Sequence, residues 1–235
     1  MSNLIECKNL TKNYGKTCAL QGVNLEIPAG GGIVGLLGPN GSGKTTLIKI
    51  LTGLLQPTAG EARIAGMEVG VETKAIVSYL SDFYSLNESY TVREELDYYC
   101  DFFADFDRCR AETMLRDLGI SSTSKVKTLS KGTKEKLALI LTLSRNARLY
   151  IFDEPIAGVD PAAREYVLET ILSNRSENST ILLSTHLISE IEQYFDHVIF
   201  LRQGSVVLSG VAEEVRKEHG KSIDALFREV FRWMY

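Results

Sequence analysis

The chain has 235 residues, of which 44% are hydrophobic and 24% charged, and its formal net charge is −4. This composition is typical of a globular protein with one large domain. The acidic balance and the absence of a basic stripe argue against nucleic acid as a partner. Four cysteines without a CxxC pair favour reduced thiols over a disulfide or zinc framework.

The first 30 residues show no leader-peptide pattern, and no apolar run approaches the ~18–20 residues that span a bilayer. We therefore expect a soluble, cytoplasmic chain. Any role at a membrane would come through a partner.

The N-terminal third alternates short apolar runs with turns, which predicts mostly strands. A turn over 12–16 separates the first two runs, and a single helix interrupts the later ones. The predicted strands are 3–9, 19–27, 33–37, 61–65 and 75–80, and the predicted helix is 44–54.

The middle of the chain changes to a helical pattern. Thr91 and Glu94 have the spacing of a capping box, and the residues after them repeat apolar side chains every three or four positions. Further helices are predicted over 107–118, ended by Gly119, and over 131–146. We interpret residues 85–146 as a helical insertion.

The last third returns to alternating strands and helices. Residues 149–152 and 180–183 are apolar throughout, as in buried parallel strands. Pro161 lies where a helix should begin, behind Asp160 as a possible N-cap. A hairpin is predicted over 198–208. Residues 211–235 are predicted to form a C-terminal helical extension. We expect its apolar stripe to pack on the chain's own domain, with a dimer or permease contact as the alternative; the stripe comprises Ile223, Leu226, Phe227, Val230, Phe231 and Met234.

One short run carries the most chemistry. Residues 38–45 fit the pattern G-x-x-x-x-G-K-[ST] between a strand-like and a helix-like segment. Glycines let backbone N–H groups wrap a phosphate, and a helix N-terminus adds a positive dipole end. Lys44 supplies a charge for the β- and γ-phosphates, which makes it a catalytic candidate, and the Thr45 hydroxyl is a candidate Mg²⁺ ligand. The predicted nucleotide-binding residues here are Gly38, Pro39, Asn40, Gly41, Ser42, Gly43, Lys44, Thr45 and Thr46.

Two adjacent acids end the apolar strand that begins at Leu149. Ligands of α/β sheets lie beyond the carboxyl ends of strands, so Asp153 is placed to hold Mg²⁺. Adjacent residues on an extended strand face opposite sides, which leaves Glu154 to orient and deprotonate a water. His186 follows another buried strand and is a third catalytic candidate, although a lone histidine is more often structural.

The order of these motifs resembles the ATP-binding subunit of ATP-binding cassette (ABC) transporters from about residue 2 to residue 215. Residues 38–45 match the Walker A loop, Asp153 and Glu154 the Walker B aspartate and catalytic glutamate, and His186 the switch histidine. Residues 129–133 resemble the signature loop, and 157–160 the D-loop. Tyr14 stands where the family places an aromatic residue that stacks on adenine.

The resemblance implies an α/β fold: a P-loop NTPase core of the ABC type with a mixed, mainly parallel sheet, an N-terminal antiparallel subdomain and the helical insertion. It also implies an ATPase with ATP and Mg²⁺ as ligands. In the family, Ser130 and the Gly132 amide would bind the γ-phosphate held by a second subunit. Two chains, a homodimer or a heterodimer, would then enclose two ATP molecules and power a separate multi-span permease from the inner face of the membrane.

Two departures from the family pattern stand out. Asp82 replaces the usual glutamine near the end of the strand 75–80, where it is a further candidate Mg²⁺ ligand. Lys131 and Thr133 replace the usual glycine and glutamine of the signature loop. Lys131 would either attract the opposite phosphate or be solvated. These variants look like those of bacterial exporters of peptide antibiotics, which favours export over import.

The partner surface is predicted around Phe83 and Tyr84, in the region that receives a permease helix in the family. The aromatic residues of the helix after Thr91 are interpreted mainly as a small helical core. Two functions compete with the transporter subunit: a non-transport ABC ATPase acting on ribosomes or nucleic acid, and a nucleotide-binding regulator without turnover. The second is disfavoured by Glu154, because binding alone needs no general base.

Overall fold

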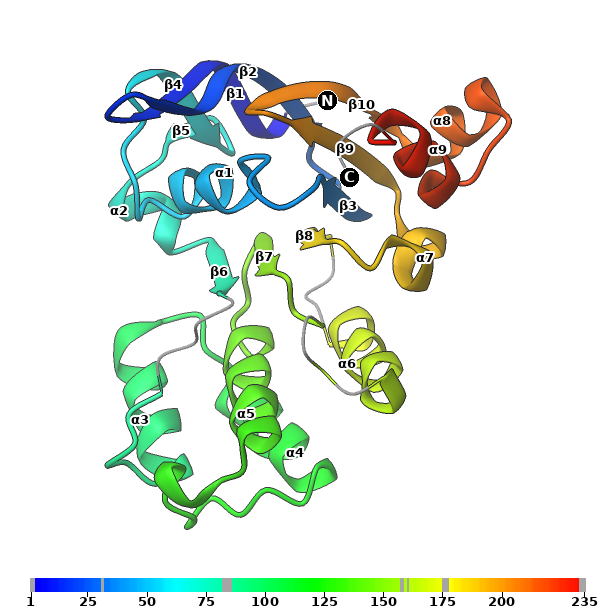
Figure 1. Ribbon diagram of the computed structural model, residues 1–235. Helices are drawn as coiled ribbons and strands as arrows, with labels where there is room; N and C mark the ends of the chain where they lie inside the picture. Colours follow the sequence, from blue (N-terminus) through cyan, green and yellow to red (C-terminus); the bar gives the residue numbers. More distant parts are fainter. Residues whose placement is uncertain are drawn as a thin grey trace.

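The computed structural model describes residues 3–30, 32–81, 86–156, 159, 161–174 and 178–232. It contains two sheets and two groups of helices (Figure 1). The strands are β1 Asn3–Tyr14, β2 Thr17–Pro28, β3 Gly32–Leu37, β4 Ala59–Ile64, β5 Met67–Glu68, β6 Val77–Leu80, β7 Leu149–Asp153, β8 Thr180–Thr185, β9 His197–Arg202 and β10 Ser205–Val211. The α-helices are α1 Lys44–Leu51, α2 Val71–Lys74, α3 Val92–Phe102, α4 Arg108–Asp117, α5 Lys131–Leu143, α6 Pro161–Ser173, α7 Ile188–Ile191, α8 Ala212–His219 and α9 Ile223–Val230.

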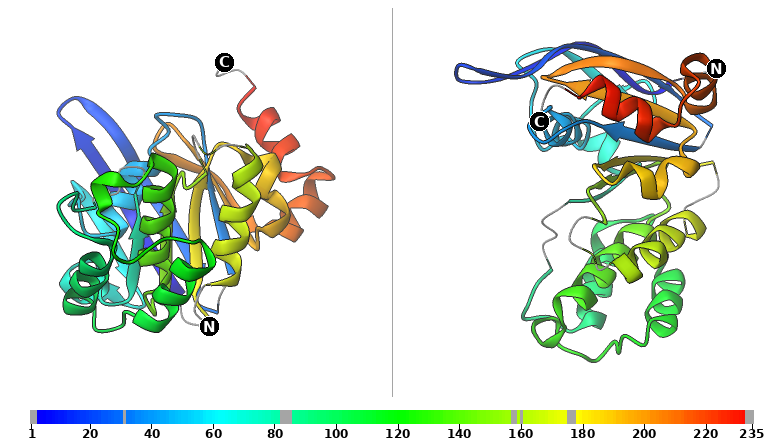
Figure 2. Two further views of the ribbon diagram at one scale, coloured as in Figure 1. Left: turned by 90° about the horizontal axis from the view of Figure 1, so that it is seen from below. Right: turned by 45° about the vertical axis from the view of Figure 1, so that its right-hand side comes forward.

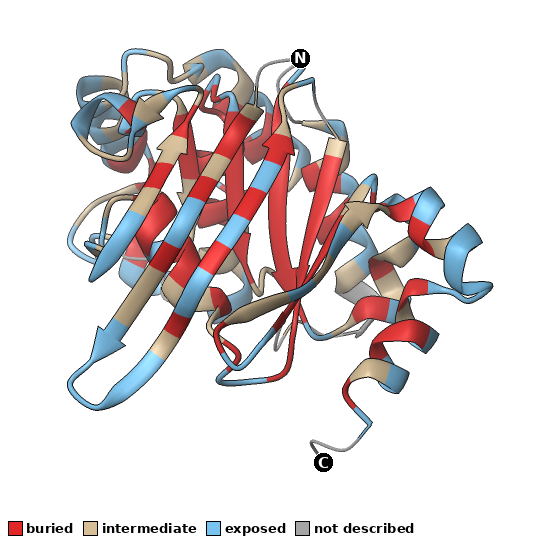
Figure 3. Cartoon of the chain, turned by 90° about the horizontal axis from the view of Figure 1, so that it is seen from above, coloured by how far each residue is buried: buried red, intermediate tan, exposed pale blue. Residues whose placement is uncertain are grey.

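The N-terminal segment forms an antiparallel sheet of order β2-β1-β4-β5. The expected antiparallel arrangement of the first two strands is confirmed, but the predicted turn over 12–16 is too long. Asn13 pairs with Cys18, and Tyr14 pairs with Thr17, at the hairpin tip. The sequence missed these extra residues because ladder pairing, rather than an apolar pattern, extends the strands there. The tip is exposed, whereas buried and exposed residues alternate along the rest of the two strands (Figure 3).

The central sheet has six strands in the order β10-β9-β3-β8-β7-β6. All neighbours are parallel except β9 and β10, which form the predicted hairpin. The strands β7 and β8 are buried along their whole length, as their apolar sequences predicted. The carboxyl ends of β3, β8 and β7 therefore meet at one edge in adjacent positions.

Side chains from the two faces of this sheet enter two different hydrophobic cores. Val34, Ile151 and Leu182 pack with α1 and the antiparallel sheet. Tyr150 and Leu183 pack with the helices of the opposite face, including α5, α6 and α9. Helix α1 therefore lies between the two sheets, and both cores hold the ends of β3, β7 and β8 in place.

Helices α3, α4 and α5 lie together below the central sheet in Figure 1, and the same separation is seen in the right-hand view of Figure 2. The capping box at Thr91 is confirmed, since its Oγ1 accepts from Glu94 N and its own N–H donates to Glu94 Oε2. Asp107 caps α4. The prediction of a helix to 146 is wrong at its end, because α5 stops at Leu143 and Arg145 turns toward the core.

Arg145 joins this helical lobe to the central sheet. Its side chain is 3% exposed and forms a two-pronged pair with Asp105, with Nε–Oδ1 at 2.7 Å and Nη2–Oδ2 at 3.0 Å. It also donates to the carbonyls of Val77 and Ala75, at the start of β6. The guanidinium lies 4.0 Å from the ring centroid of Phe103. A buried arginine with this many partners fixes the two backbone regions to each other.

The C-terminal helix is confirmed as amphipathic over Ile223–Val230, with Met234 outside the described residues. Its ring of Phe227 packs on Phe231 at 4.4 Å and on Phe200 of β9 at 5.7 Å between centroids. The stripe therefore packs against the chain's own sheet. The short elements β5 and α2 were not predicted, since they are too short to show a period.

Candidate active site

The loop between β3 and α1 has the backbone that its glycines predicted. Gly41 and Gly43 have φ of 78° and 110°, in the region that favours glycine. A Cβ on Gly43 would lie 2.6 Å from the Ala19 carbonyl oxygen, and one on Gly38 would lie 2.4 Å from that of Leu201. Only glycine therefore fits at both positions. The loop is also held from outside, because Gly204 N donates to the Ser42 carbonyl at 2.9 Å.

Lys44, the first residue of α1, turns back into this loop. Its side chain is 6% exposed, and Nζ donates to the Gly38 carbonyl at 2.6 Å. Nζ also lies 3.8 Å from Glu154 Oε1. Burial lowers the pKa of the Lys44 ammonium, and the charges of Glu154 and Asp153 oppose that shift. A buried ammonium satisfied chiefly by its own loop's carbonyls has a better partner in a phosphate.

Asp153 and Glu154 both reach this site, but not by the predicted alternation along a strand. The strand ends at Asp153, and Glu154 has a φ of 52°, so the backbone turns there. Ser184 of β8 contacts both acids: its Oγ donates to Asp153 Oδ1 at 2.6 Å and accepts from Glu154 N at 3.0 Å, and its carbonyl accepts from the same N–H at 3.1 Å. The two adjacent carboxylates therefore differ in exposure: Asp153 is 2% exposed and Glu154 is 18% exposed.

His186 contacts Glu154 directly. Its Nδ1 lies 2.8 Å from Glu154 Oε2, and its backbone N–H donates to the same oxygen at 3.3 Å. His186 thus contacts one carboxylate oxygen of Glu154, and Lys44 lies near the other. The sequence predicted all three residues as catalytic, and the structure brings them together.

The site can be tested for its fit to a triphosphate and a divalent cation. Ser42 Oγ is buried and has no hydrogen-bond partner among the described residues. Helix α1 begins at Gly43 without a side-chain cap, so its first N–H groups are open to an anion. Thr45 is the second residue of that helix, and Asp153 is a buried carboxylate at the same sheet edge. These donors and oxygens suit phosphates and Mg²⁺ respectively.

Tyr14 lies at the tip of the β1–β2 hairpin and is 48% exposed. Lys12 Nζ lies 5.5 Å from its ring centroid, on an exposed part of the sheet. An exposed ring with one cation beside it remains accessible to a planar base. The hairpin joins the loop 38–45 through Gln21 N, which donates to Gly204 O at 2.8 Å, and then through Gly204 N.

Ser130 and Gly132 lie elsewhere, at the start of α5 in the helical lobe. Ser130 Oγ accepts from Thr133 N at 3.2 Å and so caps the helix. A Cβ on Gly132 would meet nothing within 4 Å. Lys131 pairs with Glu135 at 3.8 Å across a surface. This predicted half of the site is exposed, and α5 lies in the helical lobe, apart from the sheet edge that carries the loop before α1 (Figure 1).

Several predicted residues lie outside the described part of the chain: Asp82, Phe83, Tyr84, Ala157, Gly158 and Asp160. The sequence analysis did not identify Ser184, whose hydroxyl bonds both acids. The signal was a serine at the end of a buried strand, a position where a hydroxyl must find a partner. The interpretation of the aromatic residues of α3 as a small helical core holds only in part, because Tyr98 and Phe102 are 42% and 66% exposed.

A family model described as "ABC transporter" matches residues 20–157, more than half of the chain. A second one, "AAA domain, putative AbiEii toxin, Type IV TA system", matches the overlapping range 124–192. The protein therefore belongs to the ABC transporter family.

Two curated relatives match most of the chain. It is 31% identical over 207 residues to the lantibiotic transport ATP-binding protein SrtF of Streptococcus pyogenes, covering 87% of this chain and 90% of that one. It is 33% identical over 227 residues to the daunorubicin resistance ATP-binding protein DrrA3 of Streptomyces coeruleorubidus, covering 93% and 72%.

A solved structure titled as the ATP-binding subunit of an ABC transporter shares 32% identity and superimposes with a TM-score of 0.85, covering 96% of this chain and 98% of that one. An ATP-binding cassette in its ADP conformation, 22% identical with a TM-score of 0.74 and covering 93% and 94% of the two chains, shows the same fold. The chain is thus an ATP-binding subunit whose ATPase activity is coupled to transport. These relatives do not favour the ribosome or nucleic-acid alternative. Among the described helices, none is long and apolar enough to cross a membrane.

Proposed function

We propose that the chain, as a single ATP-binding domain with its helical insertion, forms a dimer that encloses two ATP molecules and drives a separate membrane permease. The observation that carries this proposal is the division of the predicted site. The phosphate loop and the acids meet in the core, whereas Ser130 and Gly132 lie at an exposed helix start in the lobe.

Lys44 would leave the Gly38 carbonyl and bind the β- and γ-phosphates, because a doubly charged phosphate is a stronger acceptor than a neutral carbonyl. The loop amides and the start of α1 would hold the remaining oxygens. Tyr14 would stack on the base. Thr45 and Asp153 would hold Mg²⁺, with Asp82 as a further candidate, and the ion would neutralise charge on the phosphates.

Glu154 would then act as the general base. In the structure Lys44 lies at one of its oxygens and His186 at the other. Once Lys44 turns to the phosphates, Oε1 of Glu154 is free to take a proton from water. His186 would keep the carboxylate in position through Oε2 and contact the phosphate side of the site.

Ser130 and the Gly132 amide would cap the γ-phosphate held by the partner chain. The start of α5 is exposed and carries a small glycine with open space beside it, which allows close approach of a second surface. The permease would hold this dimer at the inner face of the membrane. Because relatives are named for lantibiotic transport and daunorubicin resistance, we propose an amphipathic antibiotic or peptide as the exported cargo.

The dimer can be tested with Ser130→Asp in a Glu154→Gln background. Aspartate is as good an N-cap as serine, so α5 stays capped, but it adds a negative charge where the partner's phosphate would lie. With ATP and Mg²⁺, Glu154→Gln should elute as a dimer. The double variant should bind one ATP per chain yet remain a monomer.

Ser222→Asp is the matched control, because Ser222 caps α9 through the same kind of bond, from Ala225 N to its Oγ. In the Glu154→Gln background this control should dimerise normally. The proposal is wrong if Ser130→Asp leaves ATP-dependent dimerisation unchanged, or if Glu154→Gln remains a monomer when saturated with ATP.

A further inference from the structure

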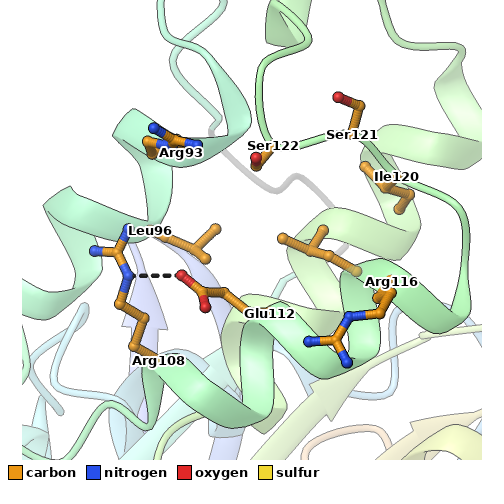
Figure 4. A pocket seen from close by; sticks show the side chains of 9 residues that line it. Arg93, Leu96, Arg108, Glu112, Arg116, Ile120, Ser121 and Ser122 are labelled. Atoms are coloured by element: carbon orange, nitrogen blue, oxygen red, sulfur yellow. Dashed lines mark hydrogen bonds and ion pairs between the residues drawn. The ribbon is translucent and has the colours of Figure 1, made fainter.

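A pocket of about 510 Å³ lies in the helical lobe, between α3, α4 and the loop that follows α4 (Figure 4). Its size is within the range of small-ligand sites. The loop is fixed over it: Arg93 N donates to the Ser122 carbonyl at 2.8 Å, and Ile120 N donates to the Leu115 carbonyl at 2.8 Å. The pocket is therefore part of the folded lobe, and it lies apart from the phosphate loop.

The rim of this pocket is positively charged. Arg93, Arg108 and Arg116 line it together with one acid, Glu112. Arg108 is already neutralised by Asp97 and by Glu112, whose Oε1 lies 2.9 Å from Arg108 Nε.

Arg93 and Arg116 have no ion pair among the residues that the structure describes. Figure 4 places them on opposite sides of the pocket. Two unpaired guanidinium groups around one pocket are notable in a chain of net charge −4.

The remaining lining adds hydroxyls and an apolar floor. Ser121 and Ser122 lie on the loop that follows α4, where the Ser121 hydroxyl already bonds Thr123 Oγ1 at 3.0 Å. Leu96, Leu115 and Ile120 supply carbon surface. A carboxylate offers one charge and two oxygens. A phosphate monoester carries about −1.5 to −2 at pH 7 and three terminal oxygens, which matches two guanidinium groups and nearby hydroxyls better.

We propose that this pocket is a second anion site, which binds the phosphate monoester head of an amphipathic molecule between Arg93 and Arg116. The apolar part of the molecule would lie on Leu96, Leu115 and Ile120. Such a head group is presented either by a free phosphorylated metabolite or by phosphatidic acid, a phospholipid with a monoester head, at a membrane surface. Because the pocket lies apart from the phosphate loop, its occupant would be an effector or a membrane contact rather than the hydrolysed nucleotide.

The test uses n-hexyl phosphate and the full chain, with ADP present to fill the phosphate loop. Calorimetry should show binding that weakens below about pH 6, where the phosphate loses its second charge. Arg93→Gln or Arg116→Gln should each weaken binding several-fold, and the double variant should weaken it about tenfold or more. Arg148→Gln, an exposed arginine outside the pocket, is the control and should bind as the wild type does.

A second experiment identifies the source of the head group. It measures sedimentation of the protein with phosphatidylcholine vesicles that either contain or lack phosphatidic acid. Arginine-dependent sedimentation with the acidic vesicles indicates a lipid, whereas binding of hexyl phosphate without vesicle binding indicates a free metabolite. The proposal is overturned if hexyl phosphate does not bind at millimolar concentration or if the double arginine variant binds it unchanged. It is also overturned if hexanoate binds equally well.

Discussion

Two helix starts in this protein have the same general chemistry but opposite surroundings. Helix α1 begins without a side-chain cap, and Lys44 is buried beside it against the loop carbonyls and Glu154. Helix α5 begins with Ser130 as its cap, on an exposed surface of the lobe. The first lies in a loop that one chain folds around its own lysine, and the second is an open surface. In the proposed dimer, the second would cover the nucleotide bound at the first of the partner chain.

The core side of this comparison is most strongly tested by Glu154→Gln. Because the amide cannot accept a proton from water, ATP hydrolysis should fall by about 10²–10⁴-fold. ATP affinity should remain within a few-fold, since glutamine keeps the bond to His186. Steady-state phosphate release and equilibrium binding measure the two quantities. Hydrolysis within a few-fold of the wild type would show that Glu154 is not the base.

The link between the two regions is tested by Arg145→Met. Removing the buried guanidinium leaves the Asp105 carboxylate unpaired and the carbonyls of Val77 and Ala75 without their donor. We expect a loss of about 3–5 kcal/mol in the free energy of unfolding. Urea titration measures it, and Arg148→Met, an exposed neighbour, should change it by less than about 0.5 kcal/mol.

Adding Asp105→Leu to Arg145→Met should recover part of the loss, because no partly buried carboxylate then remains unpaired. Equal stabilities of Arg145→Met and Arg148→Met would mean that the arginine does not hold the lobe to the sheet.

The lobe side is tested by Glu95→Gln. Burial raises the pKa of this 3%-exposed carboxyl, and only the Asn87 N–H bond opposes the shift. A folded-state pKa above the unfolded value means that stability is lost as pH rises through the folded pKa. Glu95→Gln should therefore be more stable than the wild type near pH 7, and the difference should vanish near pH 4, which urea titrations at the two pH values measure.

Its neighbour Glu94 is the control with the opposite sign. Hydrogen bonds from Thr91 lower the Glu94 pKa, so its charge contributes stability above the unfolded pKa and loses it as pH falls. Glu94→Gln should consequently be less stable than the wild type near pH 7. If both variants shift stability in the same direction, the burial of Glu95 has been misjudged.

The sequence predicted those parts of the fold that depend on neighbouring residues. The apolar strands β7 and β8, the glycine loop before α1 and the capping box at Thr91 are all set by local pattern. It did not predict the contacts that depend on residues far along the chain. Ser184 of β8 bonds Asp153 on the neighbouring strand β7, and Arg145 pairs with Asp105, which lies forty residues earlier in the chain.

The same limit explains the error at Glu154. Period-two alternation assumes that the backbone stays extended through both acids, but Glu154 has a φ of 52°, so the backbone turns directly after Asp153. The hydrogen bonds and exposure of Asp153 and Glu154 could not be predicted from the residues next to them in the sequence. The residues were identified correctly, whereas their relative orientation required the adjacent strand.

The division of the site between two chains is tested most directly by a crystal structure of Glu154→Gln with ATP and Mg²⁺. We predict two chains related by a twofold axis, with each γ-phosphate bound by Lys44 of one chain and by the partner's Ser130 and Gly132 amide. A structure in which a single chain makes every contact to the triphosphate, with Ser130 facing solvent in both copies, would contradict this account.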